Sequence, residues 1–228
     1  MAEFATILQI LLLGYLLGSV PFGVVLAKLF RLPDPRYIGS GNIGATNMLR
    51  TGNKKVALLT LLLDAGKGAA AVLVTRHLFS WPIHEPALTC LSDMVGDPAC
   101  VHTTISPALT ALAVLAAAMG HMVSPWLKFK GGKGMATMLG GCLAFSWPVG
   151  MSMLCIWLIV TFTTRYVSLG SIAALAAAPL ITLLRVDAAS ALIIGMAGGM
   201  AIWKHRDNIK RLRQGFEPKV SLGKGDKS

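Results

Sequence analysis

Apolar residues occur along this chain in long runs that short polar segments separate. The runs cover approximately residues 5–30, 56–79, 105–120, 135–147, 151–163, 169–184 and 188–203. They show neither the alternation of a half-buried strand nor the narrow apolar stripe of a surface helix. A helix needs roughly 20 mostly apolar residues to cross about 30 Å of hydrocarbon. The pattern predicts an all-α integral membrane protein with seven transmembrane helices, which form one polytopic domain over residues 1–228.

Proline and glycine mark the breaks inside and between these runs. Pro21 and Gly23 interrupt the first run, which a membrane helix tolerates. Pro148 and Gly150 are expected to form a tight turn between the fourth and fifth runs. The only charged residue before the first run is Glu3. The run therefore lacks the positively charged leader of a signal peptide and is expected to be a retained span.

The composition agrees with a membrane protein and explains the charge. Hydrophobic residues make up 54% of the chain and charged residues only 14%, whereas a soluble domain carries about a quarter charged residues. The net charge of +11 would suggest a nucleic-acid partner in a soluble protein. Here most Lys and Arg lie between the apolar runs, as the positive-inside rule predicts, so we expect a lipid bilayer and no nucleic acid as partner.

The distribution of basic residues predicts the orientation in the membrane. Nearly all of them lie in segments 31–55, 121–134 and 164–168 and in the tail beyond residue 203. With seven spans these segments share one face, which is therefore cytoplasmic, and the amino terminus lies outside. The protein is expected in the cell (inner) membrane as a multi-pass protein. The loop 80–104 would be external, where Cys90 and Cys100 could form a disulfide.

Three cytoplasmic segments, 31–55, 121–137 and 204–217, carry residues that suggest chemistry. The first contains Gly39 and Gly41, which allow tight turns and a close backbone approach to a ligand. Neutral hydrogen-bonding groups come from Ser40, Asn42, Thr46 and Asn47. Arg50 adds a planar fork suited to a phosphate. The density of these residues favours ligand binding over a simple turn.

The second segment places Gly131, Gly132, Lys133 and Gly134 directly before the fourth apolar run, whose first turn contains Thr137. A glycine loop followed by a helix amino terminus forms an anion site, because unpaired N–H groups and the helix dipole both favour negative charge. The segment does not match the Walker A pattern. A leucine stands where that pattern has its first glycine, and Gly134 stands where it has its final Ser or Thr. We therefore expect a phosphate site without a nucleoside triphosphate.

Other ionisable residues are expected to support this site. Asp64 and Lys67 lie three residues apart in the second run, where buried charges usually pair. His121, at the end of the third run, could be a base or could orient a loop. In the third segment, His205 and Asn208 would share one face of a helix that continues from the last span.

The motifs GSGNIGATNMLR, HMVSPWLKFKGGKGMAT and KHRDNIKRLRQGFE resemble those of the bacterial acyl-phosphate:glycerol-3-phosphate acyltransferases, in the same order and at the same places relative to the spans. The resemblance implies seven transmembrane helices with cytoplasmic motifs. It assigns functional roles to Ser40, Arg50, Lys133, His205 and Asn208, phosphate binding to the glycines at 131, 132 and 134, and a structural role to Glu217. Ile43 departs from the proline of some members.

The activity implied is transfer of an acyl chain from acyl phosphate to the 1-hydroxyl of glycerol 3-phosphate, giving lysophosphatidic acid and phosphate. No metal or other cofactor is expected, because acyl phosphate is already activated. The sequence leaves open which loop holds which phosphate, and whether His205 or a phosphate oxygen takes the proton. A membrane transporter of organic phosphates is the alternative; midplane charges and an inverted repeat would favour it, and the sequence shows no such repeat.

Overall fold

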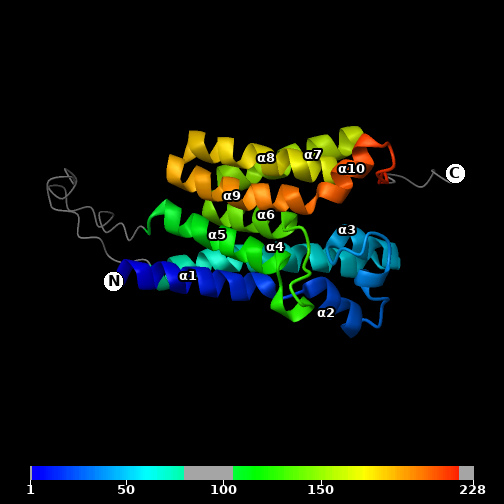
Figure 1. Ribbon diagram of the computed structural model, residues 1–228, viewed down its shortest axis with the longest axis horizontal. Coiled ribbons are helices and arrows are strands. Elements are labelled where there is room, and N and C mark those ends of the chain that lie inside the picture. Colours follow the sequence, from blue (N-terminus) through cyan, green and yellow to red (C-terminus); the bar gives the residue numbers. More distant parts are fainter. Residues whose placement is uncertain (1, 80–104, 221–228) are drawn as a thin grey trace.

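The structure is a computed structural model that describes residues 2–79 and 105–220, and all regular elements in these ranges are helical. The long helices lie roughly along one axis (Figure 1). They are α1 (Ala2–Ser19), α2 (Phe22–Leu29), α3 (Ala45–Met48), α4 (Lys54–Phe79), α5 (Pro107–Met122), α6 (Met135–Phe145), α7 (Trp147–Thr164), α8 (Val167–Arg185), α9 (Ala188–Lys204) and α10 (Arg206–Arg213). Short 3-10 turns cover Pro35–Tyr37, Leu49–Thr51 and Pro125–Leu127. The predicted external loop 80–104, with Cys90 and Cys100, lies outside the described residues.

All seven predicted apolar runs are helical, and five have the length and apolar character needed to cross a membrane. These are Glu3–Leu29, Lys54–Phe79, Pro107–Leu127, Trp147–Thr164 and Val167–Arg185. Helix α6 has 11 residues and α9 has 17. At 1.5 Å per residue they span about 17 Å and about 25 Å, less than the hydrocarbon thickness of about 30 Å. The all-α membrane class is therefore confirmed, whereas the count of seven crossings stays a prediction.

Large apolar side chains lie outside the bundle and small ones inside it. On α1 the exposed residues Phe4, Leu8, Leu12 and Leu16 repeat every four positions and so form one stripe. The opposite face of α1 meets α5 through Gly18, where a Cβ would lie 2.1 Å from the carbonyl oxygen of Ala117. Lipid tails give helices no hydrophobic reason to associate, so small residues that allow close contact hold such bundles together.

Helices α4 and α6 approach one another in the same way. A Cβ at Gly68 of α4 would lie 2.0 Å from the Thr137 carbonyl oxygen, and one at Gly140 of α6 would lie 1.9 Å from the Ala65 carbonyl oxygen. This packing fixes the amino-terminal end of α6, and with it Thr137, against the middle of α4.

Two local predictions were wrong. The break between the fourth and fifth runs falls at Ser146, and Pro148 lies in the first turn of α7, where its missing N–H costs nothing. Gly150 is instead a packing residue, since a Cβ there would lie 2.5 Å from the Leu143 Cα. The last span does not continue through His205 either: α9 ends at Lys204 and α10 begins at Arg206.

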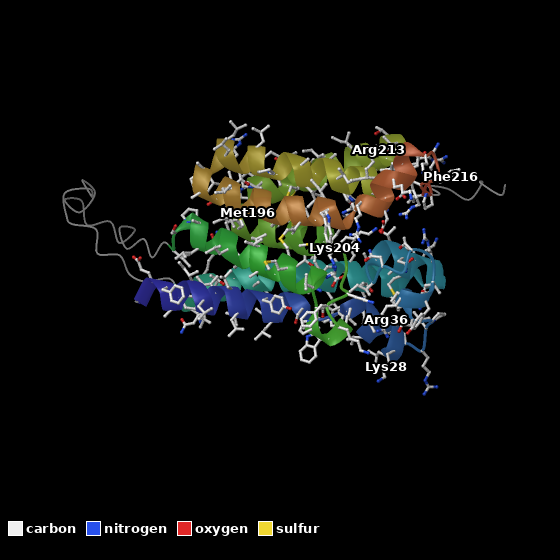
Figure 2. All side chains as sticks on the ribbon, viewed as in Figure 1. Lys28, Arg36, Met196, Lys204, Arg213 and Phe216 are labelled. Atoms are coloured by element: carbon white, nitrogen blue, oxygen red, sulfur yellow. The ribbon has the colours of Figure 1, made fainter. Side chains whose placement is uncertain are left out.

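The three motif segments gather at one end of the molecule. Helices α2, α3 and α10 lie at the end opposite the amino terminus (Figure 1). Figure 2 shows Lys28, Arg36 and Arg213 at this end, whereas Met196 lies part-way along the bundle. Segments that are far apart in the sequence therefore form one basic end, which contains the candidate site.

Candidate active site

Asn47 organises the first motif segment. Its side chain is buried in α3, and its Oδ1 accepts hydrogen bonds from Ser40 N (3.1 Å), Ser40 Oγ (3.3 Å) and Arg50 Nη1 (3.1 Å). Its Nδ2 donates to the backbone carbonyls of Pro35 (2.7 Å), Ile38 (3.1 Å) and Asn42 (2.8 Å). Both ends of the amide are thus engaged within the loop. The structure makes Asn47 a positioning residue for Ser40 and Arg50.

Glycine is required where Arg50 crosses this loop. Gly39 has φ +51°, and a Cβ there would lie 2.1 Å from Arg50 Nη1 and 2.6 Å from Asn47 Oδ1. Gly41 also has a positive φ of +69°. The guanidinium therefore lies directly over the backbone of the loop while Arg50 remains exposed. Since a guanidinium has five N–H donors, Arg50 retains donors for a phosphate.

The second motif segment forms a loop that ends in a helix amino terminus. Gly134 is the N-cap of α6 with φ +84°, and no side chain caps the helix. The first N–H groups of α6 are consequently available to an anion. Thr137 adds a hydroxyl in this first turn; it is buried, and its Oγ1 has no hydrogen-bond partner within residues 2–79 and 105–220.

A buried network of three ionisable residues lies beneath this loop. Lys67 Nζ is 2.7 Å from Asp64 Oδ1 and 2.8 Å from His121 Nδ1, and it donates to the Val20 carbonyl at 2.7 Å. The His121 carbonyl accepts a hydrogen bond from Gly132 N at 3.0 Å. The network therefore joins the break between α1 and α2, helix α4 and the glycine loop. The predicted pairing of Asp64 with Lys67 is confirmed.

Lys133 connects the glycine loop to the third motif segment. Its Nζ donates to Asn208 Oδ1, and Asn208 Nδ2 donates to Glu217 Oε1 at 2.6 Å. Glu217 also pairs with Arg211 (Nε to Oε2, 2.7 Å). Burial lowers the pKa of Lys133 to about 8, with a further contribution from the nearby Arg211. The amide of Asn208 is thereby held between a cation and a carboxylate.

Glu217 is an internal part of the site although it follows α10 in an irregular segment. Burial alone would raise its pKa, but hydrogen bonds from Asn208 and Arg211 help to outweigh burial and hold the pKa below its usual value. The carboxylate therefore stays charged and anchors Asn208. Sequence reasoning did not single out Arg211 as the partner of Glu217, because one basic residue among several in segment 204–217 gives no sign of which carboxylate it pairs with.

His205 stands between α9 and α10 as a neutral imidazole. Its Nδ1 lies 2.8 Å from the Ala201 carbonyl oxygen and must donate to it, which leaves the lone pair on Nε2. Burial lowers the pKa of His205 to about 4, assisted by the charge of Lys133. Arg50 in turn lowers the pKa of Lys133, so the three motif segments share one electrostatic environment.

An apolar cavity of about 480 Å³ adjoins this cationic region. It is lined by Met122 and Val123 at the end of α5 and by Gly199, Met200, Trp203 and Lys204 of α9. Met122 also touches the glycine loop, since a Cβ at Gly134 would lie 3.3 Å from the Met122 Cγ.

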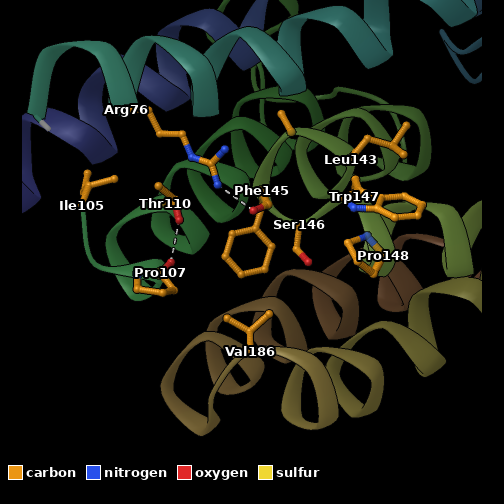
Figure 3. Close-up of a pocket in the computed structure, with 11 residues that line it drawn as sticks. Arg76, Ile105, Pro107, Thr110, Leu143, Phe145, Ser146, Trp147, Pro148 and Val186 are labelled. Carbon is orange, nitrogen blue, oxygen red and sulfur yellow. Dashed lines mark hydrogen bonds between the residues drawn. The ribbon is translucent and has the colours of Figure 1, made fainter. Parts of the chain in front are cut away.

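A second cavity of about 460 Å³ lies at the α6–α7 turn, where Arg76 Nη2 donates to the Phe145 carbonyl at 2.7 Å (Figure 3). None of the predicted site residues lines this second cavity.

These features define a helical membrane protein whose basic end combines Arg50 over a glycine loop, Lys133 beside the uncapped amino terminus of α6, a neutral histidine and an apolar cavity. Among the residues that the structure describes, no group of three or more His, Cys, Asp or Glu could hold a metal ion. The profile of the glycerol-3-phosphate acyltransferase family matches residues 8–215. The chain belongs to this family, and it is an acyltransferase.

Relatives and solved structures agree with this assignment over nearly the whole chain. The glycerol-3-phosphate acyltransferase of Roseobacter denitrificans is 46% identical over 213 residues, 93% of each chain. That of Rhodospirillum rubrum is 44% identical over 230 residues, 98% of each chain.

Two crystal structures of PlsY (YgiH), an integral membrane glycerol 3-phosphate acyltransferase, are similar to this chain. The glycerol 3-phosphate form has a TM-score of 0.78 and 35% identity, and the match covers 94% of this chain and 96% of that one. Its lysophosphatidic acid form has a TM-score of 0.76, 34% identity and coverages of 94% and 95%. The resemblance stated from the motifs is confirmed.

Proposed function

We propose that this chain transfers an acyl group from an acyl phosphate to the 1-hydroxyl of glycerol 3-phosphate, releasing lysophosphatidic acid and phosphate. The similar PlsY structures with glycerol 3-phosphate and lysophosphatidic acid supply the acceptor and the product by analogy. The observation that carries the proposal is that two cations suited to phosphate, Arg50 and Lys133, are close enough for the charge of Arg50 to lower the pKa of Lys133.

Two substrates that each bear a phosphate repel one another, so the site must hold two polyanions together. Arg50 offers a guanidinium over the first loop, and Lys133 offers an ammonium beside the amino terminus of α6. Fixing both reactants removes the entropy cost of their encounter, which contributes several kcal/mol to catalysis in well-oriented sites. The Gly131–Gly134 loop is assigned to glycerol 3-phosphate and the Arg50 region to the acyl phosphate.

The reaction needs no covalent intermediate on the protein. The glycerol 1-hydroxyl oxygen attacks the acyl carbonyl carbon, an ester bond forms, and the bond from that carbon to the phosphate oxygen breaks. Asn208 and the cations at Arg50 and Lys133 would stabilise the negative charge that develops on the oxygens. Glu217 would act indirectly, by fixing the orientation of the Asn208 amide.

The proton of the attacking hydroxyl passes to phosphate. With a pKa of about 4, His205 is a weaker base than a phosphate monoester, whose second pKa is about 6. The lone pair on His205 Nε2 can still accept a hydrogen bond from the glycerol hydroxyl and orient it. We therefore assign orientation to His205 and proton acceptance to the departing phosphate.

The acyl chain would lie in the apolar cavity between α5 and α9. This cavity meets the glycine loop at Met122, so a chain within it would place its activated carbonyl beside Lys133 and His205. The proposed topology has seven spans, including the short helices α6 and α9, with the amino terminus outside. The basic end and its site would face the cytoplasm of the inner membrane.

Release of inorganic phosphate by the purified protein tests the proposal. Palmitoyl phosphate and glycerol 3-phosphate are supplied together and separately. We expect release only with both, together with one lysophosphatidate per phosphate. Arg50→Ala should lower turnover at least 100-fold, whereas Arg36→Ala, which removes an exposed arginine paired with Asp34, should stay within threefold. Release from palmitoyl phosphate alone at an equal rate would show a phosphatase and refute the transfer.

A further inference from the structure

The hydrogen bonds of Lys67 fix the protonation of His121. Lys67 is buried beside Asp64, with which it forms an ion pair at 2.7 Å, so its amine is the charged form with three N–H donors. Three acceptors surround it: the Val20 carbonyl, Asp64 Oδ1 and His121 Nδ1. Since the ammonium has no lone pair, His121 Nδ1 must accept.

This arrangement leaves His121 with its proton on Nε2. The ring lies against the glycine loop, because a Cβ at Gly132 would be 2.1 Å from Nε2 and 2.9 Å from Cε1. Nothing within residues 2–79 and 105–220 accepts a hydrogen bond from this N–H. His121 is 4% exposed as a residue, but Nε2 is not among the fully buried side-chain atoms without a partner, so this N–H is open to a ligand oxygen beside the loop.

The surroundings of this donor point to an anion. The loop ends at the uncapped amino terminus of α6, and the buried hydroxyl of Thr137 in the first turn also has no partner in the described part of the chain. Two unpaired polar groups at one helix amino terminus match a multidentate ligand rich in oxygen acceptors. A phosphate monoester has that character.

We propose that His121 is a direct substrate-binding residue, a neutral imidazole that donates Nε2–H to the phosphate monoester at the Gly131–Gly134 loop. This inference rests on the proposed function of that loop as a phosphate site. Asp64 and Lys67 are positioning residues that act through His121, because the Lys67 ammonium keeps the proton on Nε2. The donor adds hydrogen bonding to the phosphate without adding charge.

Two substitutions at His121 distinguish the roles of its two ring nitrogens. His121→Asn retains an acceptor near Nδ1 for Lys67 and loses the donor at Nε2. His121→Gln can place an amide N–H near Nε2. Binding of glycerol 3-phosphate to the full chain is measured by calorimetry, and KM for palmitoyl phosphate by phosphate release. We expect His121→Asn to weaken binding of glycerol 3-phosphate, the substrate assigned to the Gly131–Gly134 loop, at least tenfold, and His121→Gln to restore that binding to within threefold of wild type.

A change in KM for glycerol 3-phosphate with little change in kcat marks a binding role. A loss confined to palmitoyl phosphate would overturn the placement of glycerol 3-phosphate beside His121. Affinity for both substrates within twofold of wild type in His121→Asn would overturn the proposal. Equal losses in both variants at unchanged thermal stability would show that the ring only supports Gly132, and would overturn it as well.

A measurement on the unmodified protein does not depend on the folding of variants. Histidine-selective ¹⁵N NMR should show one histidine locked as the Nε2–H form, and addition of glycerol 3-phosphate or of a non-hydrolysable acyl phosphonate should shift that Nε2 resonance. A resonance that neither ligand moves would refute the contact. If the wild-type protein binds glycerol 3-phosphate but transfers no acyl group, the proposed function fails while the test of His121 still stands.

Discussion

At the scale of single residues, Asn47 shows how a polar side chain can serve a site without touching substrate. Its amide makes six hydrogen bonds within the first motif segment: Oδ1 accepts three and Nδ2 donates three. Sequence reasoning grouped Asn47 with the substrate-binding residues Gly39 and Asn42. An amide is equally suited to a ligand and to a loop, so composition alone does not separate the two roles.

Asn47→Ala should therefore damage both stability and substrate binding. Removing the amide leaves buried carbonyls unpaired, at a cost of about 2–4 kcal/mol, and releases Arg50 from its position over Gly39. We expect a lower Tm and a KM for palmitoyl phosphate raised at least tenfold. Asn53→Ala is the matched control: Asn53 Oδ1 accepts from Val56 N at the start of α4, so its loss should lower Tm and leave KM within twofold. An unchanged KM in Asn47→Ala would contradict the positioning role.

Lys133 gives a prediction about pH. With a pKa of about 8, this lysine is charged below pH 8 and loses its charge above it, whereas glycerol 3-phosphate is already a dianion there. Because kcat/KM reports ionisations of the free enzyme, kcat/KM for glycerol 3-phosphate should fall as the pH rises through about 8. Lys133→Arg keeps its charge and should shift this alkaline decline above pH 9. Lys130→Arg, at an exposed position of the same loop, should leave the midpoint in place; an equal midpoint in Lys133→Arg would contradict the assignment.

The residue-level predictions from sequence succeeded where partners are close in the chain. Asp64 and Lys67 are three apart, so helical geometry alone brings them together. The contact between Lys67 and His121 spans 54 residues, and that between Glu217 and Asn208 depends on the turn after α10. Such contacts follow from packing that no local pattern contains.

At the scale of elements, hydrophobic runs predicted the existence of all seven long helical segments but not all of their ends. The break at His205 and the turn at Ser146 were missed. In both places the residue that ends a helix is neither proline nor glycine, and the glycine that suggested a turn, Gly150, is instead a site of close helix contact. Glycine in a membrane helix can mark a close helix contact in place of a turn.

Helix α9 carries a prediction about acyl-chain length. Gly199 lines the apolar cavity, and a Cβ there would meet nothing within 4 Å, so a large side chain can enter the cavity without displacing the helix. Gly199→Phe should lower kcat/KM for palmitoyl phosphate at least tenfold and change that for octanoyl phosphate less than threefold. Gly66→Phe is the control, since Gly66 is equally open but lies on α4 away from the cavity. Equal effects on both donors in Gly199→Phe would place the acyl chain elsewhere.

At the scale of the whole molecule, the separation of charge between the two ends is the property that sequence predicted best. The basic segments were assigned to one face by counting spans, and α2, α3 and α10 do lie together at one end (Figure 1). The reason is physical, because a basic loop resists translocation wherever it lies in the chain. Whether the short helices α6 and α9 cross the membrane depends on local bilayer thickness and on packing, which hydropathy alone does not determine.

Cysteine labelling tests the orientation and the crossing of α9 together. In a background without the four native cysteines, single cysteines replace exposed residues: Ser106 and Ala189, predicted outside, and Tyr37 and Phe216, predicted in the cytoplasm. In intact cells an impermeant maleimide should label the first two and should reach the other two only after permeabilisation. Because Ala189 and Phe216 flank α9 and α10, opposite labelling of this pair requires α9 to cross the membrane despite its length of 17 residues. Labelling of both from the same side would reduce the count of crossings and place the carboxy-terminal motif on the other face from Arg50, where the proposed site could not assemble.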